Sequence, residues 1–396
     1  MYNLYQLYSI NFFMHNLSLR QLLFFLTLLL FYSCTSVKKL TQTTAGITSL
    51  RYIGQYEIPF NLQYRNTTVG GLSGIDYDIK NGLYYMICDD RSDKNPARFY
   101  KAKILFDQNK IDTVIFTGMK YLLQQDGAVY PNNKQDRFHT ADPEAMRYNP
   151  TTKQLIWSSE GERVVNARDT VLENPSVTVI STKGEYKDNF SLPTNLTMYA
   201  TENGPRKNSV LEGMSFADDY STLFISVEEP LYEDGPAADV TGNNAYTRIY
   251  KFDVAGKNNL AQYAYKLSPV AYSAVPETAF KINGIPDILY IGNNKLLVIE
   301  RSFSTGRLPC TIKLFIADLT GATDISKTVL KNNNDFIPAT KKLLMSMDDL
   351  GIYTDNIEGV TFGPLLPNGH KTLLFIADNN FNPLEKAQIL LFEVIE

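Results

Sequence analysis

The chain has 396 residues, of which 44% are hydrophobic, 20% charged and 12% aromatic, and this suits one large folded domain or two ordinary ones. A formal net charge of only -4 gives no indication of a nucleic-acid partner. Beyond the N-terminal segment the histidines are His139 and His370, so the composition disfavours a Ser-His-Asp triad or a multi-histidine zinc site.

The N-terminal segment has the pattern of a targeting sequence. Arg20 precedes an apolar run from 22 to 32 that is short for a membrane span, and Ser33-Cys34 follows it in a loose lipobox similar to those of Bacteroidetes-type lipoproteins. The alternative is a plain signal peptide with a chance cysteine. The predicted division is a signal peptide over 1–33, a lipidated Cys34 with a polar tether over 34–48, and a folded domain over 49–396.

A lipid on Cys34 predicts an outer-membrane lipoprotein that faces the periplasm or the cell surface. The residues directly after Cys34 lack an acidic run of the kind that marks surface export, and this favours the periplasmic side. The membrane is then contacted through the lipid anchor alone.

A unit of two short strands recurs roughly every 70 residues along the predicted domain. Each unit has a polar or acidic residue, a short strand, a turn, and a strongly apolar strand that ends in acids. The first strands of the five units begin at Ser73, Glu144, Glu212, Asp287 and Glu358. Each unit continues with a third strand and usually a fourth, both bounded by Gly, Asn, Asp and Pro.

Four antiparallel strands per unit predict an all-β fold, a β-propeller with five blades. The last unit lacks a fourth strand, and an orphan strand at 50–58 precedes the first unit, so we expect this N-terminal strand to close the ring. Insertions around 122–140, 230–244 and 332–355 are long enough to hold a sixth blade or to act as lids. A β-sandwich array is the alternative fold, and a β-helix is disfavoured because its repeats are much shorter.

Propeller topology brings the start of each first strand and the end of each second strand to one rim of the central channel. Acids occupy both positions in most units, and clustered carboxylates need hard cations to neutralise them, which points to calcium. For each acid alone, a turn cap or an acceptor of backbone hydrogen bonds is the competing role. The predicted metal ligands are Asp89, Asp90, Glu144, Glu160, Glu212, Glu228, Asp287, Glu300, Glu358 and Asp378.

Arginines lie beside these acids. Arg91 follows Asp90, Arg301 follows Glu300, and Arg163 comes shortly after Glu160. A guanidinium can hold a phosphate or carboxylate through two hydrogen bonds, so these three are the predicted substrate-binding residues. Structural salt bridges are the alternative role for each of them.

Several short motifs occur in an order that resembles the phytase-like family, described as having esterase-like activity of phytase. The motifs are Gly71-Leu72-Ser73-Gly74-Ile75, Cys88-Asp89-Asp90-Arg91, Asp142-Pro143-Glu144-Ala145-Met146, Leu211-Glu212-Gly213-Met214-Ser215, Ile299-Glu300-Arg301-Ser302-Phe303 and Asn356-Ile357-Glu358-Gly359-Val360. The resemblance implies a secreted or lipid-anchored bacterial propeller and a calcium-dependent phosphoesterase.

Two functions are therefore expected to compete. The first is a calcium-dependent hydrolase of phosphate esters, with a small anionic substrate and with Glu144, Glu212, Glu300 and Glu358 as catalytic residues. The second is a non-catalytic propeller that binds a glycan, a peptide or a partner protein at the same rim of the central channel. A closed ring has no free edge to pair with another copy, so we expect a monomer.

Overall fold

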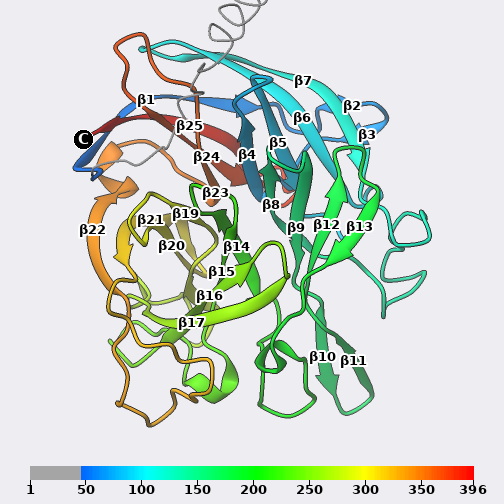
Figure 1. Cartoon of the computed structure of the whole chain (residues 1–396), viewed down its shortest axis with the longest axis vertical. Coiled ribbons are helices and arrows are strands. Elements are labelled where there is room, and N and C mark those ends of the chain that lie inside the picture. The colour runs from blue at the N-terminus through cyan, green and yellow to red at the C-terminus, as the bar shows by residue number, and fades with distance from the viewer. Residues whose placement is uncertain (1–45) are drawn as a thin grey trace, which may run out of the picture. The chain divides into compact units, whose positions relative to one another are not determined.

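The computed structural model describes residues 46–396, and these residues form a ring of five β-sheets (Figure 1). The innermost strand of each sheet lies nearest the centre of the ring, and the later strands follow outwards. The predicted five-bladed, all-β propeller is confirmed, and within the described residues there is no sixth blade.

The strands of each blade follow chain order from the centre outwards, except that β1, the first strand of the domain, is the outermost strand of blade 5. In blade 4, β18 and β19 both pair with β20 on its inner side. Blade 1 has β4 (Gly74–Asp78), β5 (Leu83–Cys88), β6 (Arg98–Phe106) and β7 (Ile111–Tyr121). Blade 2 has β8 (Pro143–Asn149), β9 (Gln154–Ser159), β12 (Ser176–Ser181) and β13 (Tyr186–Asn189). Blade 3 has β14 (Leu211–Phe216), β15 (Thr222–Val227), β16 (Tyr246–Asp253) and β17 (Asn258–Lys266). Blade 4 has β18 (Lys281–Gly284), β19 (Ile288–Tyr290), β20 (Lys295–Ser304), β21 (Arg307–Asp318) and β22 (Thr340–Ser346). Blade 5 has β23 (Asn356–Phe362), β24 (Thr372–Asp378), β25 (Ala387–Ile395) and β1 (Ser49–Ile58).

The ring closes through the N-terminal strand, as predicted. β1 pairs antiparallel with β25, from Ser49 opposite Ile395 to Ile58 opposite Ala387. Without β1 the last blade would end in three strands and leave β25 as an exposed edge. The first and last strands of the domain therefore hold one blade together.

The core lies between the blades. Each pair of neighbouring sheets encloses an apolar cluster built from alternate residues of its strands, because successive side chains of a strand point to opposite faces. Between blades 1 and 2, for example, Trp157 is fully buried and contacts Tyr130 edge-to-face at 5.7 Å. The aromatic richness of the sequence thus serves mainly to pack one blade on the next.

The insertions form local structure without adding a blade. The segment 332–355 contributes β22 and the 3-10 helix η3 (Met347–Leu350), and 230–244 holds η2 (Tyr232–Asp234). The segment 319–339 lies along the outer strand β17, where the amide of Ile325 donates to the carbonyl of Gln262 at 2.8 Å. It thereby covers part of an exposed sheet edge.

Smaller elements were not foreseen from the sequence. A hairpin of β10 (Glu162–Asn166) and β11 (Asp169–Glu173) projects from blade 2 (Figure 1). The short pair β2 (Gln63–Tyr64) and β3 (Thr67–Thr68) and the 3-10 turn η1 (Thr194–Leu196) complete the elements.

The predicted signal peptide (1–33), Cys34 and most of the tether (34–48) lie outside the described residues. Within 46–396, Cys88 and Cys310 are both buried free thiols. A search of the same residues for an apolar helix of membrane-spanning length found none.

Candidate functional site

Three of the inner strands are interrupted at the position of their acid. A β-bulge adds one residue to a strand, bends it locally and redirects a side chain. The pairing register shifts between Pro143 and Met146 in β8, between Leu211 and Met214 in β14, and between Ile357 and Gly359 in β23. Each irregular segment contains one predicted ligand, and these are Glu144, Glu212 and Glu358.

Glycine follows the acid in two of these bulges because the neighbouring inner strand lies very close. A β-carbon on Gly213 would lie 2.7 Å from the α-carbon of Asp287, and one on Gly359 would lie 2.9 Å from the carbonyl oxygen of Ser73. A side chain cannot be accommodated against backbone at such distances. The repeated Glu-Gly pair therefore combines a redirected carboxylate with close blade packing.

Two of the bulges, the ends of two second strands and the residue before β8 bring five carboxylates together at one mouth of the channel. Asp89, Asp142 and Glu144 form one group, and Glu144, Glu160 and Glu212 form another. Within each group, one oxygen from each residue lies within 4.8 Å of the others. Glu144 belongs to both groups, so it bridges two potential ion sites.

Two further acids extend this cluster with unused oxygens. Asp378 ends β24 and is 1% exposed, yet its Oδ2 has no hydrogen-bond partner. Glu358 accepts a hydrogen bond from the Asn356 amide at 2.8 Å through Oε1, while its Oε2 is buried without a partner. Buried carboxylate oxygens are usually paired, so these two oxygens are free to coordinate an ion or accept from a ligand.

Burial raises the pKa of every carboxyl in this cluster, and repulsion between the acids adds to the rise. The pKa of Asp142 rises to about 6, that of Glu358 to about 7 and that of Glu160 to about 8. The pKa values of Asp89, Glu144, Glu212 and Asp378 lie well above the ordinary range. The cluster is thus short of positive charge.

The cluster also fits calcium in the kind and spacing of its donors. Calcium takes about six to eight oxygen ligands at roughly 2.3–2.6 Å, so two oxygens on one ion lie up to about 5 Å apart. The two groups offer only carboxylate oxygens within 4.8 Å of one another. Residues 46–396 thus contain a suitable donor set for a hard cation.

Two of the predicted arginines line this mouth. Arg301 bonds to Glu228 at 2.5 Å and to the side-chain oxygen of Asn356 at 2.6 Å, and it lies 3.3 Å from Glu358. Arg91 lies 3.4 Å from Asp142 and 3.0 Å from Glu162 in an equivalent arrangement.

Each of these two guanidinium groups retains one unused donor. The Nε atoms of Arg91 and Arg301 have no hydrogen-bond partner. Glu228, a predicted metal ligand, serves instead as the main partner of Arg301.

Arg163 lies apart from the cluster. Its guanidinium donates to the carbonyl oxygens of Tyr199 at 2.9 Å and Thr201 at 3.1 Å, and it lies 4.9 Å from the ring centre of Tyr232. Arg163 thereby connects the β10–β11 hairpin by hydrogen bonds to the segment that follows blade 2. The structure thus gives this predicted substrate-binding residue a set of backbone partners.

Two predicted metal ligands also have full sets of other partners. Asp90 accepts backbone hydrogen bonds from the following turn and pairs with Arg98 at 2.7 Å. Glu300, also a predicted catalytic residue, bonds to Tyr265 at 2.8 Å and to Lys341, on the side of β20 that faces blade 3. The structure does not bring either residue into the cluster.

Asp287 lies deeper in the channel and forms its central ion pair. Its carboxylate receives two hydrogen bonds from Arg147 Nη2, at 2.8 and 2.6 Å, and one from the amide of Val360 at 2.8 Å. Arg147 also donates to the carbonyl oxygens of Met214 and Ile75. This pair, which we call the channel lock, connects the inner strands of all five blades.

Asp142, Glu162 and Asn356 belong to the mouth but were not among the predicted site residues. Asp142 stands two positions before Glu144, so a search for acids flanking each first strand would have included it. Glu162 lies on the hairpin that the repeat pattern does not contain, and no sequence signal placed it beside Arg91.

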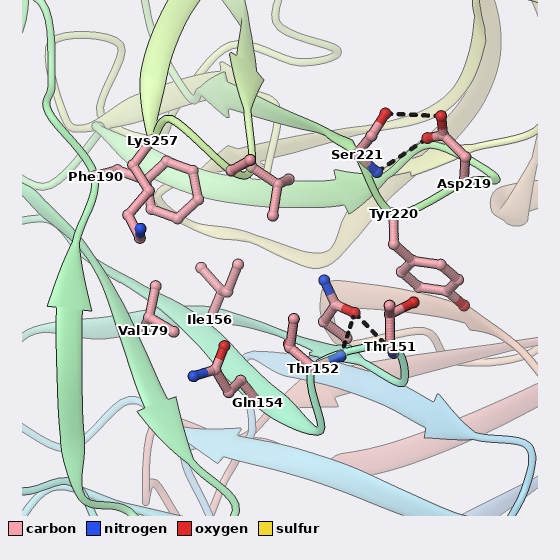
Figure 2. A pocket seen from close by; sticks show the side chains of 13 residues that line it. Thr151, Thr152, Gln154, Ile156, Val179, Phe190, Asp219, Tyr220, Ser221 and Lys257 are labelled. Carbon is pink, nitrogen blue, oxygen red and sulfur yellow. Dashed lines mark hydrogen bonds between the residues drawn. The ribbon is translucent and has the colours of Figure 1, made fainter.

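A separate pocket lies at the other end of blades 2 and 3 (Figure 2). It has a volume of about 400 Å³, and apolar side chains such as Ile156 and Phe190 line it. Its ionisable residues already have partners, since Lys257 pairs with Asp188 at 3.0 Å and Asp219 accepts from Ser221 at 2.7 Å. It therefore lacks the unsatisfied charge that distinguishes the mouth.

Solved structures similar to this chain include two carbohydrate-active enzymes and a propeller. An endo-arabinase from Bacteroides thetaiotaomicron aligns over 86% of this chain and 97% of its own, at 13% identity and a TM-score of 0.44. An exo-beta-1,3-galactanase from Phanerochaete chrysosporium aligns over 86% of this chain and 64% of its own, again at 13% identity and 0.44. The Dos1 propeller aligns over 83% and 69%, at 8% identity and 0.31. At sequence identities this low, the similarity relates only to the fold and not to the function.

The comparison with curated proteins gave no match. The family model of phytase-like proteins, described as "Esterase-like activity of phytase", matches residues 67–381. This stretch contains the inner strands of all five blades and every carboxylate of the mouth. The chain therefore belongs to the phytase-like family.

Proposed function

We propose that this protein is a calcium-dependent hydrolase of phosphate esters. The observation that carries the proposal is the pair of carboxylate groups that share Glu144, with the buried unpaired oxygens of Glu358 and Asp378 nearby. An acid cluster of this kind is costly to bury without a cation. Membership of the phytase-like family supports the choice of an ester as substrate.

In this proposal the calcium ligands come from Asp89, Asp142, Glu144, Glu160 and Glu212. Bound calcium would supply polarisation of the phosphoryl oxygens and a coordinated water of lowered pKa. The chain's own contribution is a rigid donor set, because each acid is fixed by a bulge or a strand end in a packed blade.

Arg301 and Glu358 are the residues we assign to the ester itself. Arg301 is anchored by Glu228 and Asn356, so its guanidinium needs little ordering on binding an anion. Burial raises the pKa of Glu358 to about 7, which suits a group that takes up a proton near neutral pH. Arg91 has a corresponding arrangement beside Asp142 and Glu162.

The test is phosphate release by the full-length protein in detergent, from phytate and from a simple aryl phosphate. Release is measured with calcium and again with a chelator. We expect calcium-dependent release that falls by about a hundredfold or more in Glu212→Gln, because the second carboxylate group loses a charged donor. Glu57→Gln is the matched control, since Glu57 is an exposed residue of β1.

Each result bears on a different part of the proposal. Calcium-dependent release that persists in Glu212→Gln would contradict the assigned site. No release with either ester would contradict the hydrolase and favour the binding module for a glycan, peptide or partner protein.

We further propose that Cys34 carries a lipid and anchors the domain to the outer membrane, with the periplasmic side preferred. Incorporation of labelled palmitate by the wild-type chain, and its loss in Cys34→Ala, is the expected result. A monomer is proposed because β1 occupies the edge that β25 would otherwise expose. Light scattering that gives twice the chain mass would contradict it.

A further inference from the structure

Blade 4 extends above the mouth further than the other blades do. The second strands of blades 1, 2, 3 and 5 end at or just before the rim acid, whereas β20 continues four residues beyond Glu300 to Ser304. This extension pairs with β18 on one side and with the start of β21 on the other. We call these three segments, residues 281–284, 301–304 and 307–312, the flap.

The preceding loop, 271–280, is hydrogen-bonded to the flap and to the turn at its end. The amide of Ala271 donates to Ser302 Oγ at 2.9 Å, and that of Val275 donates to the carbonyl oxygen of Thr305 at 2.8 Å. The amide of Thr305 donates in turn to the carbonyl oxygen of Phe280 at 3.0 Å. Phe280 is therefore held against the end of the flap.

The flap face that carries Arg301 is otherwise apolar. Arg301 and Phe303 are alternate residues of β20, so they share a face, and Ile282 lies directly opposite Phe303. Phe280 precedes Ile282 by two residues, and its ring centre lies 6.1 Å from that of Phe303. A strip of apolar side chains thus rises from Arg301 towards the tip.

The outer end of this strip is exposed. Phe280 is 63% exposed, and Leu308, which follows the residue opposite Ser304, is 67% exposed. Val275, whose amide bonds to Thr305, is 61% exposed. Scattered exposed apolar residues are common, but three of them on the flap and its attached loop, beside a charged mouth, indicate a binding surface.

We infer that this strip binds the apolar organic group of a phosphate monoester whose phosphate lies at Arg301; the inference rests on the function proposed above. Two observations favour a monoester of this kind over a small, densely charged polyanion. The strip is continuous with Arg301 on one sheet face. The two arginines that line the mouth, Arg91 and Arg301, are also already paired with acids, which leaves little uncompensated positive charge for a polyanion.

The experiment compares phenylphosphonate with methylphosphonate, two stable analogues that differ only in their organic group. Binding to the full-length protein in calcium is measured by calorimetry. We expect phenylphosphonate to bind about tenfold more tightly, in proportion to the apolar area it buries. Phe280→Ser and Leu308→Ser should each reduce this ratio to about threefold or less. Leu365→Ser, at a 58% exposed residue in the turn between β23 and β24, is the control that should leave the ratio unchanged.

Equal affinity for the two phosphonates, binding of neither, or a ratio that survives both flap variants would overturn the inference. The readout is binding, so it separates this inference from the proposed hydrolase. Selective binding of phenylphosphonate without phosphate release from phenyl phosphate would retain the apolar strip and reject the hydrolase. Calcium-dependent release with no preference between aryl and small polar esters would do the reverse.

Discussion

Two groups of buried carboxylates lie on the inner strands of this propeller, and their charges are balanced very differently. In the channel lock, Asp287 faces Arg147 and accepts further hydrogen bonds from the backbone. At the mouth, many acids share two arginines, and two buried oxygens have no partner. The channel lock pairs its acid with an arginine, whereas the mouth has more acids than arginines and offers oxygens that could hold a metal ion. Acids at equivalent positions of the repeat can therefore have opposite roles.

The largest expected effect comes from breaking the channel lock. Asp287→Asn leaves the buried guanidinium of Arg147 without its counter-charge and sets an amide nitrogen against backbone donors. We expect the free energy of unfolding to fall by about 3–5 kcal/mol, the usual cost of removing one partner of a buried ion pair. Chemical denaturation followed by circular dichroism measures this.

The double variant Arg147→Met with Asp287→Leu is the control for the channel lock. It removes both charges, so it should recover part of the lost stability. A loss below about 1 kcal/mol in Asp287→Asn would show that the two carboxylate groups do not differ as described.

The pH dependence of folding stability, measured in chelator, should reflect the titration of the mouth carboxyls. Burial raises the folded-state pKa of Asp142 to about 6, of Glu358 to about 7 and of Glu160 to about 8. The folded state therefore binds more protons than the unfolded state above the ordinary carboxyl pKa. Stability should fall as pH rises from about 5 to about 8, by up to about 1.4 kcal/mol per pH unit for each group that titrates.

Added calcium should reduce this fall, because the ion replaces the protons as the neutralising charge at the mouth. Burial also raises the pKa of Asp287 in the channel lock to about 6, so a smaller fall up to about pH 6 should remain in calcium. Thermal melts between pH 5 and pH 8, with calcium and with chelator, provide the comparison. Stability that rises with pH in chelator would mean that the mouth acids are neutralised within the protein itself.

The repeat pattern was sufficient to predict the blades and their closure. Apolar second strands and the orphan strand predicted at 50–58 identify five sheets and the ring, because hydrophobic periodicity reports directly on strand burial. The β10–β11 hairpin was not foreseen, since a two-stranded insertion has too short a pattern to stand out in a loop. β18 has only four residues, so its pattern is also too short to be recognised, although it forms part of the flap.

The mouth was predicted in part. Topology alone places Asp89, Glu144, Glu160 and Glu212 at one rim, and the structure brings them together. Which face of a strand an acid occupies depends on bulges and on register, and a one-residue difference reverses it. That is why Glu300 faces Tyr265 and Lys341, and why Asp287 faces Arg147, although both occupy the repeat positions.

Glu358→Gln gives the smallest and most discriminating effect, because it is the counterpart of Asp287→Asn at the mouth. It removes one negative charge whose neighbours include Glu228, while Arg301 keeps Glu228 as its partner. In chelator near pH 5 we expect a change within about 1 kcal/mol, since the wild-type carboxyl is largely protonated there. Between pH 5 and pH 7.5 the variant should gain about 1–2 kcal/mol relative to wild type, because it no longer has a carboxyl that must ionise in a buried site. Denaturation at both pH values measures this gain. The same difference from wild type at both values would show that Glu358 ionises freely, and the contrast with Asp287 would then rest on Arg147 alone.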